Sequence, residues 1–88
     1  MELNNNFILK EVGGEIMLVY QNEKTVDFSK VITLNEIGKE IYLLIKEGKE
    51  ENEIVSSLLF EYEVSQEVLK KDVHEFIKKL KELKIIND

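Results

Sequence analysis

Residues that commonly perform catalysis are scarce in this sequence. Its 88 residues include one histidine, His74, and no cysteine, so no thiolate can act as a nucleophile or a metal ligand. Lysines lie about one helical turn from His74 on both sides, at Lys70, Lys71 and Lys78. With lysines at these neighbouring positions, we expect the ring to have no orienting carboxylate. We therefore expect His74 to face solvent, and we predict no catalytic residue.

Two further groups of residues have structural explanations. Gly13 and Gly14 stand between two apolar runs, as in the turn of a β-hairpin rather than in a phosphate-binding loop. Glu50, Glu51 and Glu53 begin a predicted helix, where the helix dipole favours acidic side chains. One histidine and scattered acids match no recognised metal-ligand spacing. The sequence therefore predicts no metal, no cofactor and no enzymatic activity.

The composition is that of a small folded domain. Hydrophobic residues make up 43% of the chain and charged residues 34%, and the length suits one domain over residues 1–88. The 12 lysines are outnumbered by 18 acidic residues, and this net charge of −6 argues against general nucleic-acid binding. No apolar run approaches the ~20 residues of a membrane-spanning helix, and the N-terminus lacks the signal-peptide pattern. We expect a cytoplasmic protein that does not contact the membrane.

The first third of the chain has the pattern of three β-strands. Two apolar runs, residues 7–12 and 16–20, are joined through Gly13 and Gly14, which supply the positive φ of a tight hairpin turn. Alternation of apolar and polar residues over 26–34 predicts a third strand. This strand leads directly into the helical part, so we expect it at a sheet edge, where unpaired backbone groups can accept another strand.

After Asn35 the apolar spacing becomes helical. The first predicted helix is capped by Asn35 and ended by Gly48, the second covers residues 51–62, and the third begins after Ser65. The third helix carries an apolar stripe: Val68, Leu69, Val73, Phe76, Ile77, Leu80 and Leu83. Residues 85–86 are expected to fold back against the core. The predicted fold class is α+β, a three-stranded antiparallel sheet followed by three helices.

Lysines are concentrated on the third predicted helix. Residues 66–84 hold six lysines and four acids, a local charge of +2. This helix and the third strand could form the walls of a groove in which a guest peptide adds as a further strand. The alternative is a solvated helix face, with Phe76 and Leu80 as core residues.

An ordered set of residues runs through the helical part of the chain. The set is Leu34-Asn35-x-x-Gly38-x-x-Ile41-Tyr42, Gly48, Glu53-Ile54-Val55, Leu58, Tyr62-x-Val64 and Asp72-Val73-x-x-Phe76-Ile77-x-x-Leu80. It resembles the PqqD-like family, whose founder is the pyrroloquinoline-quinone synthesis protein D and whose fold is the RiPP (ribosomally synthesised, modified peptide) recognition element. The resemblance covers residues 7–86 and implies three strands and three helices in a winged-helix-like arrangement.

The resemblance implies a non-catalytic peptide chaperone. Such a protein binds the leader segment of a ribosomally made precursor peptide and presents the core segment to a modifying enzyme, often a radical S-adenosylmethionine (SAM) enzyme. The leader would pair with the third strand, at Lys30, Val31, Ile32, Thr33 and Leu34. It would pack against the third helix, at residues from Asp72, Val73, Phe76, Lys79 and Leu80, where lysines would suit an acidic leader. The opposite flank of that helix would instead use Lys70, His74, Ile77 and Lys81.

Two other functions are compatible with the predicted topology. A winged-helix DNA-binding protein would share the fold, although the net charge and the lack of arginine argue against it. A self-pairing assembly module would use the exposed strand edge to bind its own copy. The chaperone itself could be a monomer or a homodimer.

Overall fold

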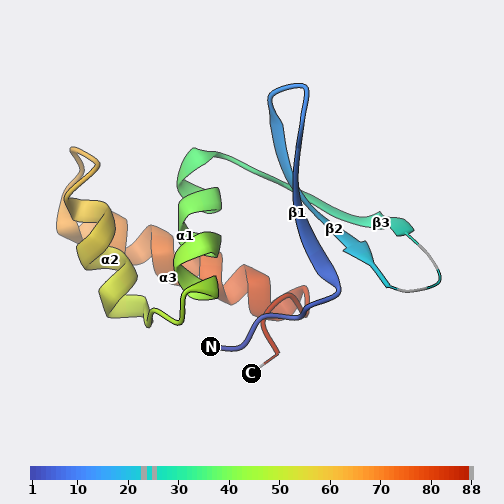
Figure 1. Ribbon diagram of the computed structural model, residues 1–88. Coiled ribbons are helices and arrows are strands. Elements are labelled where there is room, and N and C mark those ends of the chain that lie inside the picture. Colours follow the sequence, from blue (N-terminus) through green and yellow to red (C-terminus); the bar gives the residue numbers. More distant parts are fainter. Residues whose placement is uncertain (23, 25, 88) are drawn as a thin grey trace.

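The computed structural model describes residues 1–22, 24 and 26–87, and the side chains of residues 26–30 lie outside this description (Figure 1). Three strands come first: β1 (Phe7–Val12), β2 (Glu15–Gln21) and β3 (Val26–Leu34). Three helices follow: α1 (Glu36–Lys46), α2 (Glu51–Leu59) and α3 (Gln66–Glu82). The predicted α+β order is confirmed, and it is consistent with a winged-helix-like arrangement.

The sheet is antiparallel, with β2 in the centre and β1 and β3 at its edges. Gly13 and Gly14 join β1 to β2 with φ values of 59° and 83°, as the sequence predicts. A register shift between Val19 and Tyr20 interrupts the pairing of β2 with β3. Beyond it the ladder is regular, and Leu18 lies opposite Ile32. Within the described ranges β3 pairs only with β2, so its other edge is available to a further strand.

The helices begin at side-chain caps. The Asn35 side chain accepts a hydrogen bond from the Gly38 amide at 2.7 Å, and the Ser65 hydroxyl accepts one from the Val68 amide at 3.2 Å. At the start of α2, the Glu53 carboxylate accepts a hydrogen bond from the Glu50 amide at 3.0 Å. These contacts fix the starts of all three helices and so position the surface of α3.

Helix α2 ends at Leu59, whereas the sequence pattern predicted an end at Tyr62. The amides of Glu61 and Tyr62 both donate to the carbonyl oxygen of Leu58 at 3.0 Å. Because one carbonyl accepts both bonds, the chain leaves the helix in a tight turn. Residues 60–62 therefore belong to the connection between α2 and α3.

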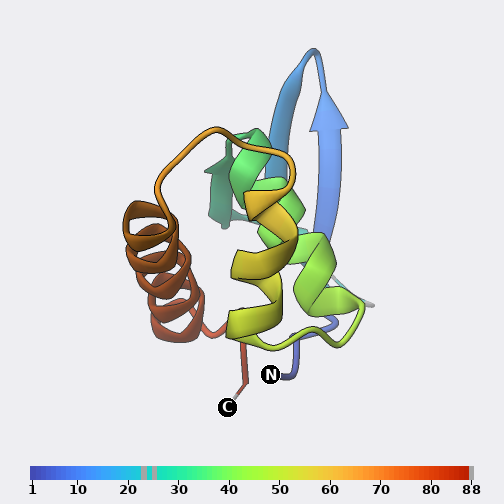
Figure 2. The same ribbon diagram turned by 90° about the vertical axis from the view of Figure 1, so that its left-hand side faces the viewer.

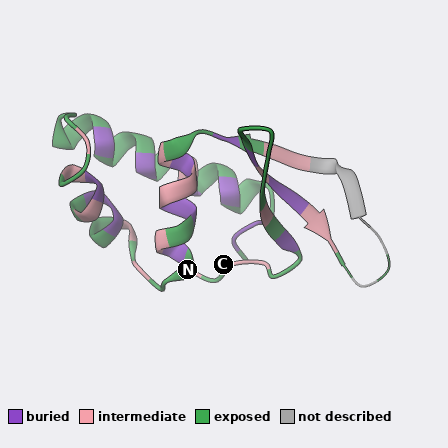
Figure 3. Ribbon diagram, turned by 45° about the horizontal axis from the view of Figure 1, so that its top comes forward, coloured by how far each residue is buried: buried purple, intermediate pink, exposed green. Residues whose placement is uncertain are grey.

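The core lies between the sheet and the three helices. Buried residues recur along one side of each helix, and exposed residues occupy the other side (Figure 3). Ile85 and Ile86 are buried, as predicted, and Leu3 pairs with Ile86. The two termini consequently lie side by side (Figures 1 and 2). No polar side chain is buried in the part of the chain that the structure describes.

Candidate functional site

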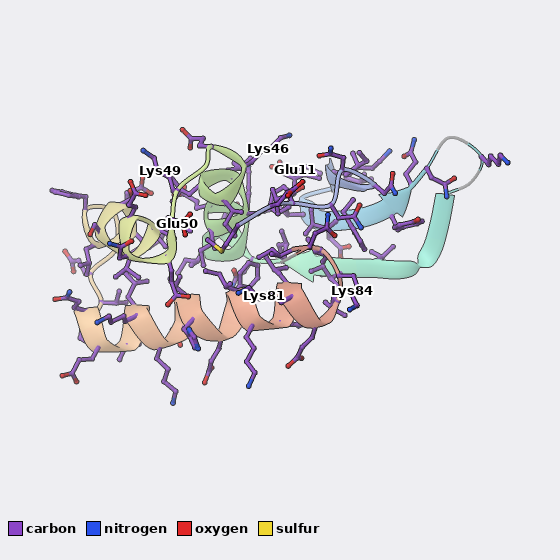
Figure 4. The ribbon with its side chains drawn as sticks, turned by 90° about the horizontal axis from the view of Figure 1, so that it is seen from below. Glu11, Lys46, Lys49, Glu50, Lys81 and Lys84 are labelled. Atoms are coloured by element: carbon purple, nitrogen blue, oxygen red, sulfur yellow. The ribbon has the colours of Figure 1, made fainter. Side chains whose placement is uncertain are left out.

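Two cavities lie along one flank of α3. The larger, of about 540 Å³, is bordered by all three strands, by Asn4 and by the end of α3 with the residues that follow it. The smaller, of about 340 Å³, is bordered by the start of α1 and the middle of α3. Figure 4 shows the end of β3 beside the C-terminal half of α3; Lys81 is labelled on this helix, and Lys84 just after its end. We call the two cavities together the β3–α3 groove. Its lining residues include Tyr20, Val31, Ile32, Glu82, Leu83 and Lys84 in the larger cavity, and Asn35, Ile37, Gly38, Ile41, Asp72, Glu75, Phe76 and Lys79 in the smaller.

The helical period explains why one flank of α3 borders both cavities. Asp72, Phe76, Lys79 and Leu83 follow at intervals of four, three and four residues, which places them on the same side of a helix. Asp72, Phe76 and Lys79 line the smaller cavity, and Leu83 lines the larger. This is the flank that the family resemblance assigned first.

The opposite flank of α3 faces α2 instead. His74 Nδ1 lies 3.2 Å from the carboxylate of Glu51, which is the first residue of α2, and Ile77 is buried. His74 is exposed, as expected, but the expectation that it lacks a nearby carboxylate is wrong. That expectation considered only residues on the same helix, whereas Glu51 comes from a different one.

On β3, the predicted contact residues fall into three groups. Val31 and Ile32 are partly exposed and line the larger cavity. Thr33 is exposed, whereas Leu34 is buried in the core. The backbone of Lys30 belongs to β3, but its side chain lies outside the described residues. The backbone edge of these residues is thus the feature they share.

On α3, two predicted contact residues are core residues. Val73 and Leu80 are 0% exposed, because they lie on the side of the helix that packs against the rest of the core. Their side chains therefore cannot line the groove. The alternative reading of Leu80 as a core residue is confirmed. Phe76 has both roles, since it packs against the core and also lines the smaller cavity.

Sequence reasoning missed several groove residues. Glu75 and Leu83 could have been found by extending the helical spacing from Asp72 and Lys79 by three or four residues. Gly38 of α1 could not, because its proximity to α3 arises only in the folded chain. A Cβ atom on Gly38 would lie 3.3 Å from a ring carbon of Phe76, so the glycine lets this ring approach α1 closely.

Charged side chains of both signs line the smaller cavity. Lys39 of α1 forms an ion pair with Glu11 of β1, and this hydrogen bond raises the pKa of Lys39. By contrast, Asp72, Glu75 and Lys79 have no side-chain partner within the described residues. Two carboxylates and one ammonium group therefore line this cavity, which is not uniformly basic.

Other classes of site receive no support from the described residues. They contain no group of three or more histidine, aspartate or glutamate side chains placed to hold a metal ion. Across the same residues, no helix has the length and apolar character needed to cross a membrane.

The chain matches known proteins in sequence pattern and in fold. Residues 15–86 match the family described as coenzyme PQQ synthesis protein D (PqqD). No curated protein matches the chain. Among solved structures, TbiB1 in complex with the TbiA(beta) leader peptide is 23% identical, with a TM-score of 0.78 over 98% of this chain and 94% of that chain. A lasso peptide synthetase B1 complexed with its leader peptide is 18% identical, with a TM-score of 0.77 over 96% of this chain and 93% of that chain.

Proposed function

The chain belongs to the PqqD family, and on that premise we propose that it binds the leader segment of a ribosomally synthesised precursor peptide. It then presents the peptide to a modifying enzyme and performs no catalysis itself. One observation carries the proposal: β3 is an edge strand, and together with the C-terminal end of α3 it borders the 540 Å³ cavity. An edge strand facing a helix wall is the arrangement that strand addition requires.

In this proposal the leader pairs with the backbone of residues 30–34 as a fourth strand. Its side chains alternate in direction, so every second one points toward α3. There it contacts Phe76, Lys79 or Asp72, while Val73 and Leu80 support the wall from within the core. Holding the leader raises the local concentration of the core segment at the enzyme, which can increase apparent affinity by ~10²–10⁴ without new active-site contacts.

The two structural neighbours support this assignment, because both were solved with leader peptides bound. The proposal further includes a single peptide-recognition domain over residues 1–88, a cytoplasmic location and a radical SAM enzyme as partner. The protein acts as a monomer or homodimer and binds neither nucleic acid nor membrane. The DNA-binding and self-pairing alternatives have no comparable support.

An NMR titration tests the binding site directly. ¹⁵N-labelled protein is titrated with the leader of the precursor peptide encoded beside its gene. We expect saturable shifts at residues 31–34 and at Asp72, Phe76 and Lys79, with Lys70, His74 and Lys81 unaffected, and a Kd of ~1 μM, about −8 kcal/mol. If no shifts appear at a peptide concentration about a hundredfold above this Kd, the proposal is contradicted.

A pair of proline variants tests strand addition. Successive residues of an antiparallel strand direct their amides alternately to the two sides. Ile32 and Thr33 are successive residues of β3, so one amide faces β2 and the other faces the guest. Of Ile32→Pro and Thr33→Pro, one should be destabilised and the other should stay folded but lose leader binding. Lys24→Ala, between β2 and β3, is the control. If both single proline variants fold and both bind the leader as tightly as the wild type, strand addition is contradicted.

A further inference from the structure

The smaller cavity of the groove carries charges of both signs in a defined order along α3. The carboxylates of Asp72 and Glu75 come first, and the ammonium group of Lys79 follows one helical turn later. Apolar side chains of Ile37 and Phe76 line the same cavity. Because none of the three charged groups has a side-chain partner in the described structure, each is available to a guest.

The spacing of these charges matches that of a β-strand. Glu75 and Lys79 are four residues apart, which is about 6 Å along a helix axis. Alternate residues of a strand point to the same face and are about 6.6–6.8 Å apart. Two side chains of one guest strand, at positions i and i+2, can therefore reach Glu75 and Lys79 together.

Guest binding makes this charge order selective. A guest strand over the cavity removes water from both carboxylates and from the ammonium group, and a buried charge without a partner costs free energy. A guest with complementary charges replaces the lost hydration with charge-assisted hydrogen bonds. A guest with charges in the reverse order places like charges together, which disfavours it.

Building on the proposed function, we infer that the groove selects a peptide with a cationic side chain two positions from an acidic one. The lysine or arginine contacts Asp72 and Glu75, and the aspartate or glutamate contacts Lys79. The lysine-rich sequence of α3 suggests a simply acidic leader, but the two carboxylates in the cavity require a mixed pair. Asp72, Glu75 and Lys79 are thus specificity-determining residues.

A displayed peptide library provides the test. Yeast cells displaying random twelve-residue peptides are sorted for binding to the purified wild-type protein. We expect the enriched peptides to carry lysine or arginine two positions from aspartate or glutamate more often than the unsorted library does. A representative peptide is then synthesised with its two charged residues in the original and in the exchanged order.

A charge exchange in the protein completes the test. The double variant Glu75→Lys, Lys79→Glu keeps the net charge and exchanges the charges at these two positions, while Asp72 stays acidic. It should bind the original peptide about tenfold more weakly, the loss of roughly one charge-assisted hydrogen bond, and recover affinity for the exchanged peptide. The matched control is Glu67→Lys, Lys71→Glu, which makes the same exchange at exposed positions of α3 outside both cavities. This control should bind the original peptide like the wild type.

The outcomes separate this inference from the proposed function. The enriched peptides could shift the groove amides yet lack the charge pair, and bind the wild type and the exchanged variant equally. This result overturns the inference alone. Failure of any peptide to enrich over unlabelled background overturns the proposed function as well. Recovery of affinity only when both protein and peptide are exchanged supports both.

Discussion

Replacing Gly38 with alanine should weaken guest binding with only a small loss of stability. The new Cβ atom would lie 3.1 Å from Asn35 Oδ1 and 3.3 Å and 3.4 Å from two ring carbons of Phe76. These contacts are tighter than ordinary, so the ring and the cap must move by tenths of an ångström. Alanine in place of a helical glycine raises the free energy of unfolding by about 1 kcal/mol. Overpacking of this kind lowers the free energy of unfolding by about 1–3 kcal/mol. The expected net loss is about 1 kcal/mol.

The effect on binding follows from the place of Phe76 in the groove. A Cβ atom at position 38 would press on one side of the ring, and the ring also lines the smaller cavity. Displacement away from α1 therefore pushes the ring into the space that a guest would occupy. We expect about tenfold weaker leader binding, equivalent to ~1.4 kcal/mol. Urea denaturation followed by circular dichroism measures the stability, and isothermal titration calorimetry measures the affinity.

A double-mutant cycle isolates the contact between the two positions. With Phe76→Leu already in place, the ring is absent, and Gly38→Ala should stabilise the protein through helix propensity by up to about 1 kcal/mol. The two substitutions should therefore show a coupling energy of about 1–2 kcal/mol. If their effects on the free energy of unfolding simply add, and Gly38→Ala binds leader like the wild type, the reasoning is refuted.

Four further predictions follow from named contacts and from burial. Asn35→Ala removes the cap on α1 and should cost about 1 kcal/mol, lowering Tm by roughly 4–8 °C in a thermal melt. The pKa of Glu40 is raised above the ordinary 4.5 by a hydrogen bond with Glu61, by partial burial and by the negative charge of Glu61. The ionised form is thus disfavoured in the folded state, so Glu40→Gln should be more stable than the wild type at pH 7, and urea denaturation should show this difference shrinking as the pH falls through that raised pKa. Leu83→Ala should weaken leader binding in the NMR titration with little change in stability, because Leu83 is 40% exposed. Leu80→Ala should cost about 2–5 kcal/mol in urea denaturation, because the residue is fully buried.

The fold could be predicted largely because its boundaries depend on local signals. Paired glycines at 13–14 specify a hairpin turn, and side-chain caps at Asn35 and Ser65 specify helix starts. The end of α2 has no such signal: no glycine or proline follows Leu59 closely, and the chain turns because two amides share the Leu58 carbonyl. That sharing depends on tertiary packing and is not visible in a pattern of residue types.

The position of the groove could be predicted only in outline. The resemblance and the strand order indicated β3 and α3, but the sequence left both flanks of α3 open. Which flank of α3 borders the groove depends on the location of α2. Because α2 places Glu51 beside His74, the flank of α3 that carries Asp72 faces the cavities. Contacts such as this one join residues 23 positions apart, and a helical period cannot anticipate them.

The apolar stripe of α3 is wider than its core requires, and this excess is itself an argument for a guest. Val73, Ile77 and Leu80 are buried, but Phe76 is only partly buried and Leu83 is 40% exposed. All five fit one helical stripe, so periodicity cannot separate wall from core; only the tertiary cover does. Phe76 lines the smaller cavity, and Leu83 lines the larger one, which β3 also borders. A strand added to the edge of β3 would cover them and complete the sheet at the same time, which explains why a domain this small leaves apolar surface there.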